Sequence, residues 1–191
     1  MSQLKVNSII PTAGVPTGGG GGIIQVLSNT TKDSTGSISL PVHASGETNF
    51  VDVTDQNVTI TPTSNTSKIL VSFSQLGESN ISANKVSCIL KRAISGGATT
   101  QIKGAASSNR GRVTTVASIS YQLDEGSTPE LFHCAGYLDS PNTTSAVTYT
   151  VQVGSMEAAS GTWFYNRTVT DSDNSYSERG LSWITVMEVS A

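Results

Sequence analysis

Side chains able to act as catalytic acids, bases or nucleophiles are few in this sequence of 191 residues. The chain has two histidines, His43 and His133, and two cysteines, Cys88 and Cys134. Acid–base and nucleophilic catalysis require such groups within hydrogen-bonding reach of one another. His133 and Cys134 are neighbours in a strand-like run, so their side chains point to opposite faces and cannot pair with each other. We therefore expect that the protein is not an enzyme and holds no cofactor.

No combination of residues predicts a metal site or a phosphate site. Cys88 and Cys134 lie in strand-like runs, which favours small buried side chains, and the sequence leaves open whether they form a disulfide. The segment 171–174, Asp-Ser-Asp-Asn, resembles part of a calcium loop but lacks the later glycine and glutamate, so we expect a solvated loop. The Gly18–Gly22 run precedes a strand-like segment and not a helix, so it does not form a phosphate-binding loop.

Aromatic side chains provide the candidate binding residues. Trp163, Phe164 and Tyr165 are consecutive, so a strand places Phe164 on the face opposite the other two. One of these faces belongs to the core and the other to a neighbour or a ligand. Aromatic residues are enriched both at subunit interfaces and at binding sites. We take Trp163, Tyr165 and Tyr176 as candidate contacts with a neighbouring subunit, which is the favoured interpretation, or with a glycan.

The elements that position these residues are strands. No segment has apolar residues at helical spacing over a helical length, and turn residues separate short β-branched runs. The sequence therefore predicts an all-β, two-sheet antiparallel sandwich of jelly-roll type. Residues 28–39 are expected as loop or edge. The segments expected as strands are 23–27, 51–60, 68–73, 85–94, 112–122, 131–138, 146–153, 163–169 and 181–189.

Two of these segments indicate which residues face the core. In 146–153, the odd-numbered Val147 to Val153 alternate with outward-facing Thr148, Thr150 and Gln152. The segment 181–189 is apolar on both faces, which predicts a central position in a sheet. We expect Val151 and Trp183 in the core.

Composition excludes several partners. Charged residues make up 13% of the chain, the net charge is −3, and the isoelectric point is about 5.3, so nothing indicates nucleic-acid binding. No apolar run approaches the roughly 20 residues that span a bilayer, and the start of the chain lacks the pattern of a signal peptide. We expect one domain, made in a cytosol, with no membrane insertion.

A flexible junction divides the chain. The Gly18–Gly22 run cannot contribute side chains to a core, so the apolar peptide before it requires another protein for stability. We expect residues 1–22 to be an extended anchoring arm and residues 23–191 to be the sandwich domain. The anchoring residues of the arm are Leu4, Val6, Ile9, Ile10 and Pro11.

Several stretches, in this order and spanning nearly the whole chain, resemble a family of short structural proteins and tail-fibre ends of bacteriophages, above all those of marine and cyanobacterial hosts. The resemblance implies a virion component of the fibre or receptor-binding kind, a homotrimer of jelly-roll-like domains, assembled in the bacterial host cytoplasm. Unlike a full fibre, the chain has no shaft. The stretches are 4–11 with the glycines and Ile23–Val26, Val58–Pro62 running into Ser67–Val71, Leu138–Ser145, Asn166–Thr168 and Ile184–Val189.

Two functions fit these features equally at the level of sequence. In the first, a fibre-tip or host-attachment protein presents the trimeric sandwich to a glycan of the bacterial surface. In the second, a capsid decoration or head-fibre protein clamps capsid subunits with its arm. In either case residues 1–22 bind other virion proteins of the tail, baseplate or capsid. A secreted lectin-like module is disfavoured by the missing signal peptide.

Overall fold

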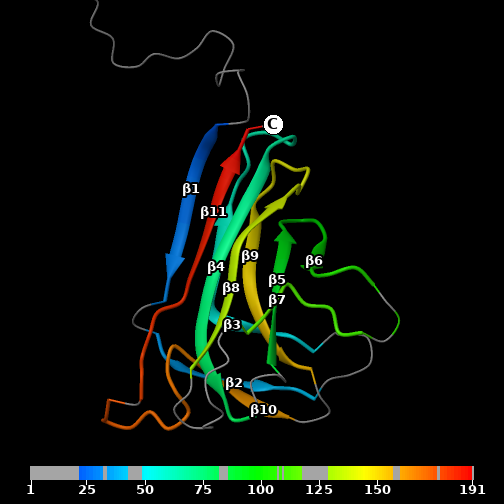
Figure 1. Ribbon diagram of the computed structural model, residues 1–191. Coiled ribbons are helices and arrows are strands. Elements are labelled where there is room, and N and C mark those ends of the chain that lie inside the picture. The colour runs from blue at the N-terminus through cyan, green and yellow to red at the C-terminus, as the bar shows by residue number, and fades with distance from the viewer. Residues whose placement is uncertain are drawn as a thin grey trace, which may run out of the picture.

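The computed structural model confirms an all-β sandwich (Figure 1). It describes residues 22–31, 34–42, 49–81, 86–106, 108, 110–117, 129–156, 160–175 and 177–190. These residues form eleven strands in two antiparallel sheets and contain no helix. The whole arm up to residue 21 lies outside the described residues, so the structure does not test the role assigned to Leu4, Val6, Ile9, Ile10 and Pro11.

The first sheet has six strands, with β4 at its centre. Its strand order is β1-β11-β4-β10-β2. β8 pairs with β4 on the side of β4 that faces away from β11. The second sheet has the order β3-β9-β5-β6, with β7 also paired to β5. The first sheet contains β1 (Ile23–Thr30), β2 (Gly36–Leu40), β4 (Lys68–Ser79), β8 (Glu130–Asp139), β10 (Gly161–Tyr165) and β11 (Trp183–Val189). The second contains β3 (Val51–Ile60), β5 (Val86–Ile94), β6 (Thr99–Ile102), β7 (Thr115–Val116) and β9 (Val147–Ser155).

Eight of these strands follow the path of a jelly roll. They form four nested antiparallel pairs, β1 with β11, β3 with β9, β4 with β8 and β5 with β6. Such nesting results when one long antiparallel hairpin of the chain is rolled up. Successive strand pairs then lie in the first and in the second sheet by turns. The roll brings the start of β1 beside the end of β11, where Ser190 N donates to Gly22 O at 3.0 Å.

The strand predictions from sequence are largely confirmed, with three differences. The structure adds two short strands, β2 and β6, whose residues are mostly polar or glycine and carry little apolar pattern. The long strand expected over 112–122 is wrong in its first part: only Thr115–Val116 is strand, and 118–122 lies outside the described residues. β10 ends at Tyr165, and the next residue, Asn166, has the left-handed φ of 60°, which begins a turn.

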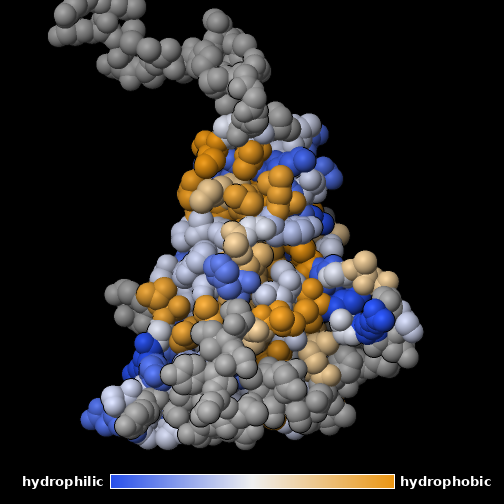
Figure 2. All heavy atoms as spheres, in the orientation of Figure 1, coloured by the Kyte–Doolittle hydropathy of each residue, from blue (hydrophilic) through white to orange (hydrophobic). Residues whose placement is uncertain are grey.

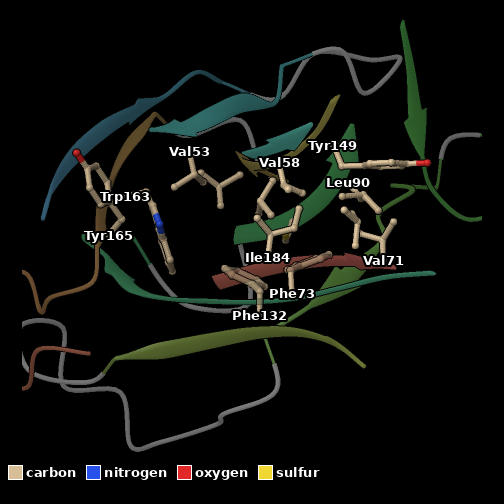
Figure 3. Close-up of a cluster of buried hydrophobic side chains, with 14 of the residues drawn as sticks. Val53, Val58, Val71, Phe73, Leu90, Phe132, Tyr149, Trp163, Tyr165 and Ile184 are labelled. Atoms are coloured by element: carbon tan, nitrogen blue, oxygen red, sulfur yellow. The ribbon is translucent and has the colours of Figure 1, made fainter. Parts of the chain in front are cut away.

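The core lies between the two sheets, where side chains from both layers point toward one another (Figure 3). At one end the rings of Trp163 and Phe132 pack with centroids 5.3 Å apart. β4 passes close to this ring at Gly77, where an added Cβ would come within 2.5 Å of Trp163. The side chains drawn from the second sheet include Val53, Val58, Leu90 and Tyr149, and those from the first include Val71, Phe73 and Ile184.

The predicted alternation of β9 is confirmed, but part of its outer face is not open to water. Val147, Tyr149, Val151 and Val153 are all fully buried in the core. Thr150 faces away from the core, yet it is only 6% exposed because β3 and β5 flank it.

The prediction for Trp183 is wrong. β11 does occupy an interior position between β1 and β4, but Ile184 and Val186 are its core residues. Trp183 lies on the outer face, half-buried, with its ring edge-on to His133 at a centroid distance of 6.3 Å.

One side of the sandwich is partly closed by β7. This short strand pairs with β5 in the second sheet, and the next residue, Ala117, bridges to Phe132 of β8 in the first. Thr115 Oγ1 also donates to the carbonyl of His133 at 3.1 Å. Beyond this closure the edges of β6 and β8 stay apart, which leaves room between the sheets.

We expect Val151→Asp to prevent folding, because it places an unpaired carboxylate in a dry core at a cost comparable to the roughly 5–15 kcal/mol that stabilises a domain. The matched control is Thr148→Asp on the outer face of the same strand. It loses a hydrogen bond to Thr59 Oγ1 (2.8 Å), worth about 1 kcal/mol. Soluble yield and thermal melting followed by circular dichroism measure both. Equal losses for the two variants would contradict the assigned faces.

Candidate functional site

A pocket of about 440 Å³ opens between the edges of β6 and β8, where the two sheets separate. This volume lies within the range of about 300–1,000 Å³ found for small-molecule sites. Its wall combines charged, amide, hydroxyl and aromatic side chains. The lining residues are Arg92, Thr100, Gln101, Ile102, Lys103, Gly104, Val113, Thr114, Tyr137 and Asp139.

Strand register explains why polar residues converge there. Arg92 continues the core-facing row of β5 after Cys88 and Leu90, and it lies directly opposite Tyr149 of β9. On β8, Tyr137 and Asp139 lie opposite Val71 and Ile69 of β4, which are core residues. Side chains on directly opposite residues share a face. The pocket is therefore the end of the core layer, in which charged and aromatic polar groups replace aliphatic ones.

A buried ion pair joins the two sheets at the floor of this region. Arg92 Nη1 of the second sheet donates to both carboxylate oxygens of Asp139 of the first, at 2.8 and 2.9 Å. Tyr149 donates its hydroxyl to Asp139 Oδ2 at 2.7 Å. The side chains of Arg92 and Asp139 are only 18% and 5% exposed. In Figure 3 the Tyr149 ring extends out of the aliphatic cluster and carries its hydroxyl at the far end.

The protonation state of Tyr149 is fixed by this arrangement. Burial and then the hydrogen bond to Asp139 raise the pKa of the Tyr149 phenol well above its usual range. The Tyr149 phenol therefore stays protonated and donates a hydrogen bond. Asp139 accepts from both Tyr149 and Arg92.

The wall on the β6 side is held by its own hydrogen bonds. Thr114 Oγ1 accepts from the Leu90 amide at 2.7 Å and donates to the carbonyl of Ile102. Lys103 Nζ donates to Gln101 Oε1 at 3.3 Å. The Gly104 amide donates to the Val113 carbonyl at 3.2 Å, which closes the base of the loop between β6 and β7. These bonds keep the wall in place before a ligand arrives.

Tyr137 is the aromatic residue of the pocket that a ligand can reach. It is 39% exposed, and it extends from β8 on the same face as Asp139. An exposed ring of this kind beside amides and hydroxyls can stack against one flat apolar face of a ligand while its edges form hydrogen bonds.

The aromatic candidates from sequence lie elsewhere. The alternation of Trp163, Phe164 and Tyr165 is confirmed, but Trp163 and Tyr165 form the buried face, so neither offers a surface to a glycan or a neighbouring subunit. Phe164 is the outward residue, and the Arg167 guanidinium covers its ring at 4.5 Å from the centroid. Tyr176 lies outside the described residues.

Other chemically active groups are occupied or enclosed. Cys88 and Cys134 are free thiols, and burial raises the pKa of both, which disfavours the reactive thiolate. Asp171 of the calcium-like segment accepts two hydrogen bonds from Arg179, each at 2.9 Å, and these bonds lower its pKa. Burial raises the pKa of Glu130 to about 8. This side chain lies in the interior, where Ser79 Oγ donates to Glu130 Oε1 at 3.4 Å.

Two negative observations apply to the residues that the structure describes. None of their histidine, cysteine and acidic side chains gather in a group of three or more that could hold a metal ion. No helix among them has the length and apolar character required to cross a bilayer.

Sequence reasoning missed the pocket, although one signal was present. Arg92 follows Leu90 and Cys88 at period two, and Asp139 follows Tyr137 at period two, directly after the 131–138 segment. A charge at a core-facing position requires a partner, which indicates a buried pair. The sequence alone did not say which residue would pair with which.

Comparison with known proteins adds no relative. No protein-family model matches the chain, and no curated protein matches it.

We expect Asp139→Ala to lower the free energy of unfolding by about 3–5 kcal/mol, because it leaves a mostly buried Arg92 without its counter-ion and Tyr149 without its acceptor. Urea denaturation measures this loss. The control is Asp52→Ala: Asp52 pairs with Lys91 and accepts a hydrogen bond from Gln152 at 2.7 Å, but its side chain is 50% exposed. Exposed ion pairs contribute about 0–1 kcal/mol, and a hydrogen bond contributes about 1 kcal/mol, so we expect a smaller loss than for Asp139→Ala. Similar losses for both variants would show that the Asp139 pair has no special role.

Proposed function

We propose that the protein is a bacteriophage virion component of the fibre-tip or host-attachment kind, which binds a glycan of the bacterial surface through its sandwich domain. The observation that carries the proposal is the pocket between β6 and β8, where an exposed aromatic ring stands beside preformed hydrogen-bonding groups. Saccharides have the matching chemistry, since their rings stack on aromatic faces and their hydroxyl groups form hydrogen bonds at the edges.

The position of β1 is compatible with attachment through the residues before it. β1 is one edge strand of the first sheet, whereas the pocket borders β8 at the opposite edge. Attachment at the edge where β1 begins would leave the pocket accessible. A glycine run of this composition is expected from the sequence to let several domains reach one cell surface together.

An apolar surface on the outer face of the first sheet would join several copies of the chain. Directly opposite residues on four neighbouring strands form a row on its outer face, and Figure 2 shows hydrophobic side chains gathered over β1 and β11. Apolar patches of this kind on soluble proteins commonly mark interfaces. We propose that this row forms the contact between the subunits of a homotrimer. Three copies of a weak glycan site would then raise the avidity for the cell surface without new contacts at any one site. The row contains Val26, Met187, Leu70 and Leu138.

Labelling of phage particles tests the attachment function. We expect immunogold against this chain to mark fibre tips in negative-stain images, and we expect the purified chain to slow adsorption of the phage to its host by occupying the receptor. Label on the capsid shell, with adsorption unchanged, would contradict attachment and favour capsid decoration.

Light scattering tests the trimer. We expect about three times the chain mass for the wild type, and a shift toward monomer for Leu138→Glu, because three carboxylates would be buried in an apolar contact. Val116→Glu is the control, since Val116 is also exposed but lies on β7, outside the row. A wild-type monomer at micromolar concentration would exclude the trimer.

A further inference from the structure

We propose that the pocket between β6 and β8 is selective for an N-acetylated sugar, that is, a hexose unit bearing an acetamido group. This inference rests on the proposed glycan-binding function and assigns the chemical class of its ligand. An acetamido group presents a carbonyl oxygen that accepts a hydrogen bond, an N–H that donates one, and an apolar methyl group. The wall on the β6 side offers a counterpart to each of the three.

The first support is a pair of polar side chains that stand side by side. Arg92 of β5 and Thr100 of β6 are direct partners in the strand register, so their side chains share the face that borders the pocket. Such partners hold their Cβ atoms about 5 Å apart. The Thr100 side chain is exposed, so its hydroxyl can accept the acetamido N–H while Arg92 donates to the carbonyl oxygen.

The second support is that Arg92 has donors to spare. Its hydrogen bonds to the two carboxylate oxygens of Asp139 are both donated by Nη1. Among the described residues, Nη2 donates to no acceptor, and Nε is buried without one. A guanidinium carries five donor hydrogens in a fixed fork. Arg92 can therefore donate to a ligand carbonyl while its pair with Asp139 stays intact.

The third support is apolar surface beside this polar pair. Ile102 follows Thr100 at period two on β6, and it lies opposite the core residue Leu90, so it is on the same face as Thr100. Val113 lines the same pocket and is held there by the hydrogen bond from the Gly104 amide to its carbonyl. Ile102 and Val113 are both only partly buried, which leaves apolar surface that a ligand methyl group can cover. A plain hexose carries a hydroxyl group in place of the acetamido group and would leave this surface uncovered.

The sugar ring itself would lie against the other wall. Tyr137 extends from β8, and its 39% exposed ring matches one apolar face of a pyranose. The volume of about 440 Å³ lies in the range of small-molecule sites, so it can hold a sugar unit together with its substituent. The ring would stack on Tyr137 while the acetamido group points toward β6.

Nuclear magnetic resonance titration of the full chain with a matched pair of probes tests the inference. Methyl N-acetylglucosaminide and methyl glucoside differ only in the acetamido group, which replaces one hydroxyl group. We expect the N-acetylated probe to shift amide signals of residues 100–104 and 113, and to bind about tenfold more tightly, as burial of one methyl group and one further hydrogen bond allow. Equal affinities for the two probes, or shifts confined to other parts of the domain, would overturn the inference.

Two pairs of variants assign the preference to residues. Val113→Thr keeps the shape of the side chain but replaces a methyl group by a hydroxyl group, and Thr100→Val makes the reverse change. Each should weaken binding of the N-acetylated probe about threefold to fivefold and leave glucoside binding unchanged. The controls are Val116→Thr and Thr99→Val, because both residues are exposed and neither lines the pocket, and they should change neither affinity. A tenfold preference that survives both Val113→Thr and Thr100→Val would overturn the assignment.

The test also separates this inference from the proposed function. If the purified chain slows phage adsorption but binds the two probes equally, the N-acetylated class is wrong and host attachment stands. If it neither slows adsorption nor binds either probe, both are wrong.

Discussion

The carboxylate of Asp139 is buried where the two sheets meet, and a charge in that position requires compensation from its neighbours. Arg92 and Tyr149 supply it from the opposite sheet, through three hydrogen bonds of 2.7 to 2.9 Å. This contact fixes the distance between the sheets beside the pocket and directs the Arg92 guanidinium to its wall. Well-packed apolar residues would stabilise a sandwich equally well, so stability alone does not account for the charged contact.

The jelly-roll path determines where such a site can form. The path places β6 at one edge of the second sheet and β8 at one edge of the first. The residue after β7, Ala117, bridges to Phe132, which joins the sheets on the same side as the pocket. The same path places β1, the first described strand, at the far edge of the first sheet. The described domain therefore begins at the edge opposite the pocket.

Some features could be predicted from the sequence because they follow from short-range periodicity. The alternation around Val151 and the opposed faces of Trp163 and Phe164 are confirmed for this reason. Which face meets the core is a tertiary property: Trp163 is in the core and Trp183 is not, although both occur in apolar strands. The pocket was beyond prediction, because it joins Arg92 to Asp139 across 47 positions and depends on how the sheets pair.

A crystal structure of the full chain with an oligosaccharide of the bacterial surface is the most direct test of the pocket as a ligand site. We expect electron density for a sugar ring against Tyr137, with the Arg92–Asp139 pair unchanged. Density for the oligosaccharide on another surface, with the pocket between β6 and β8 filled only by water, would contradict the assignment.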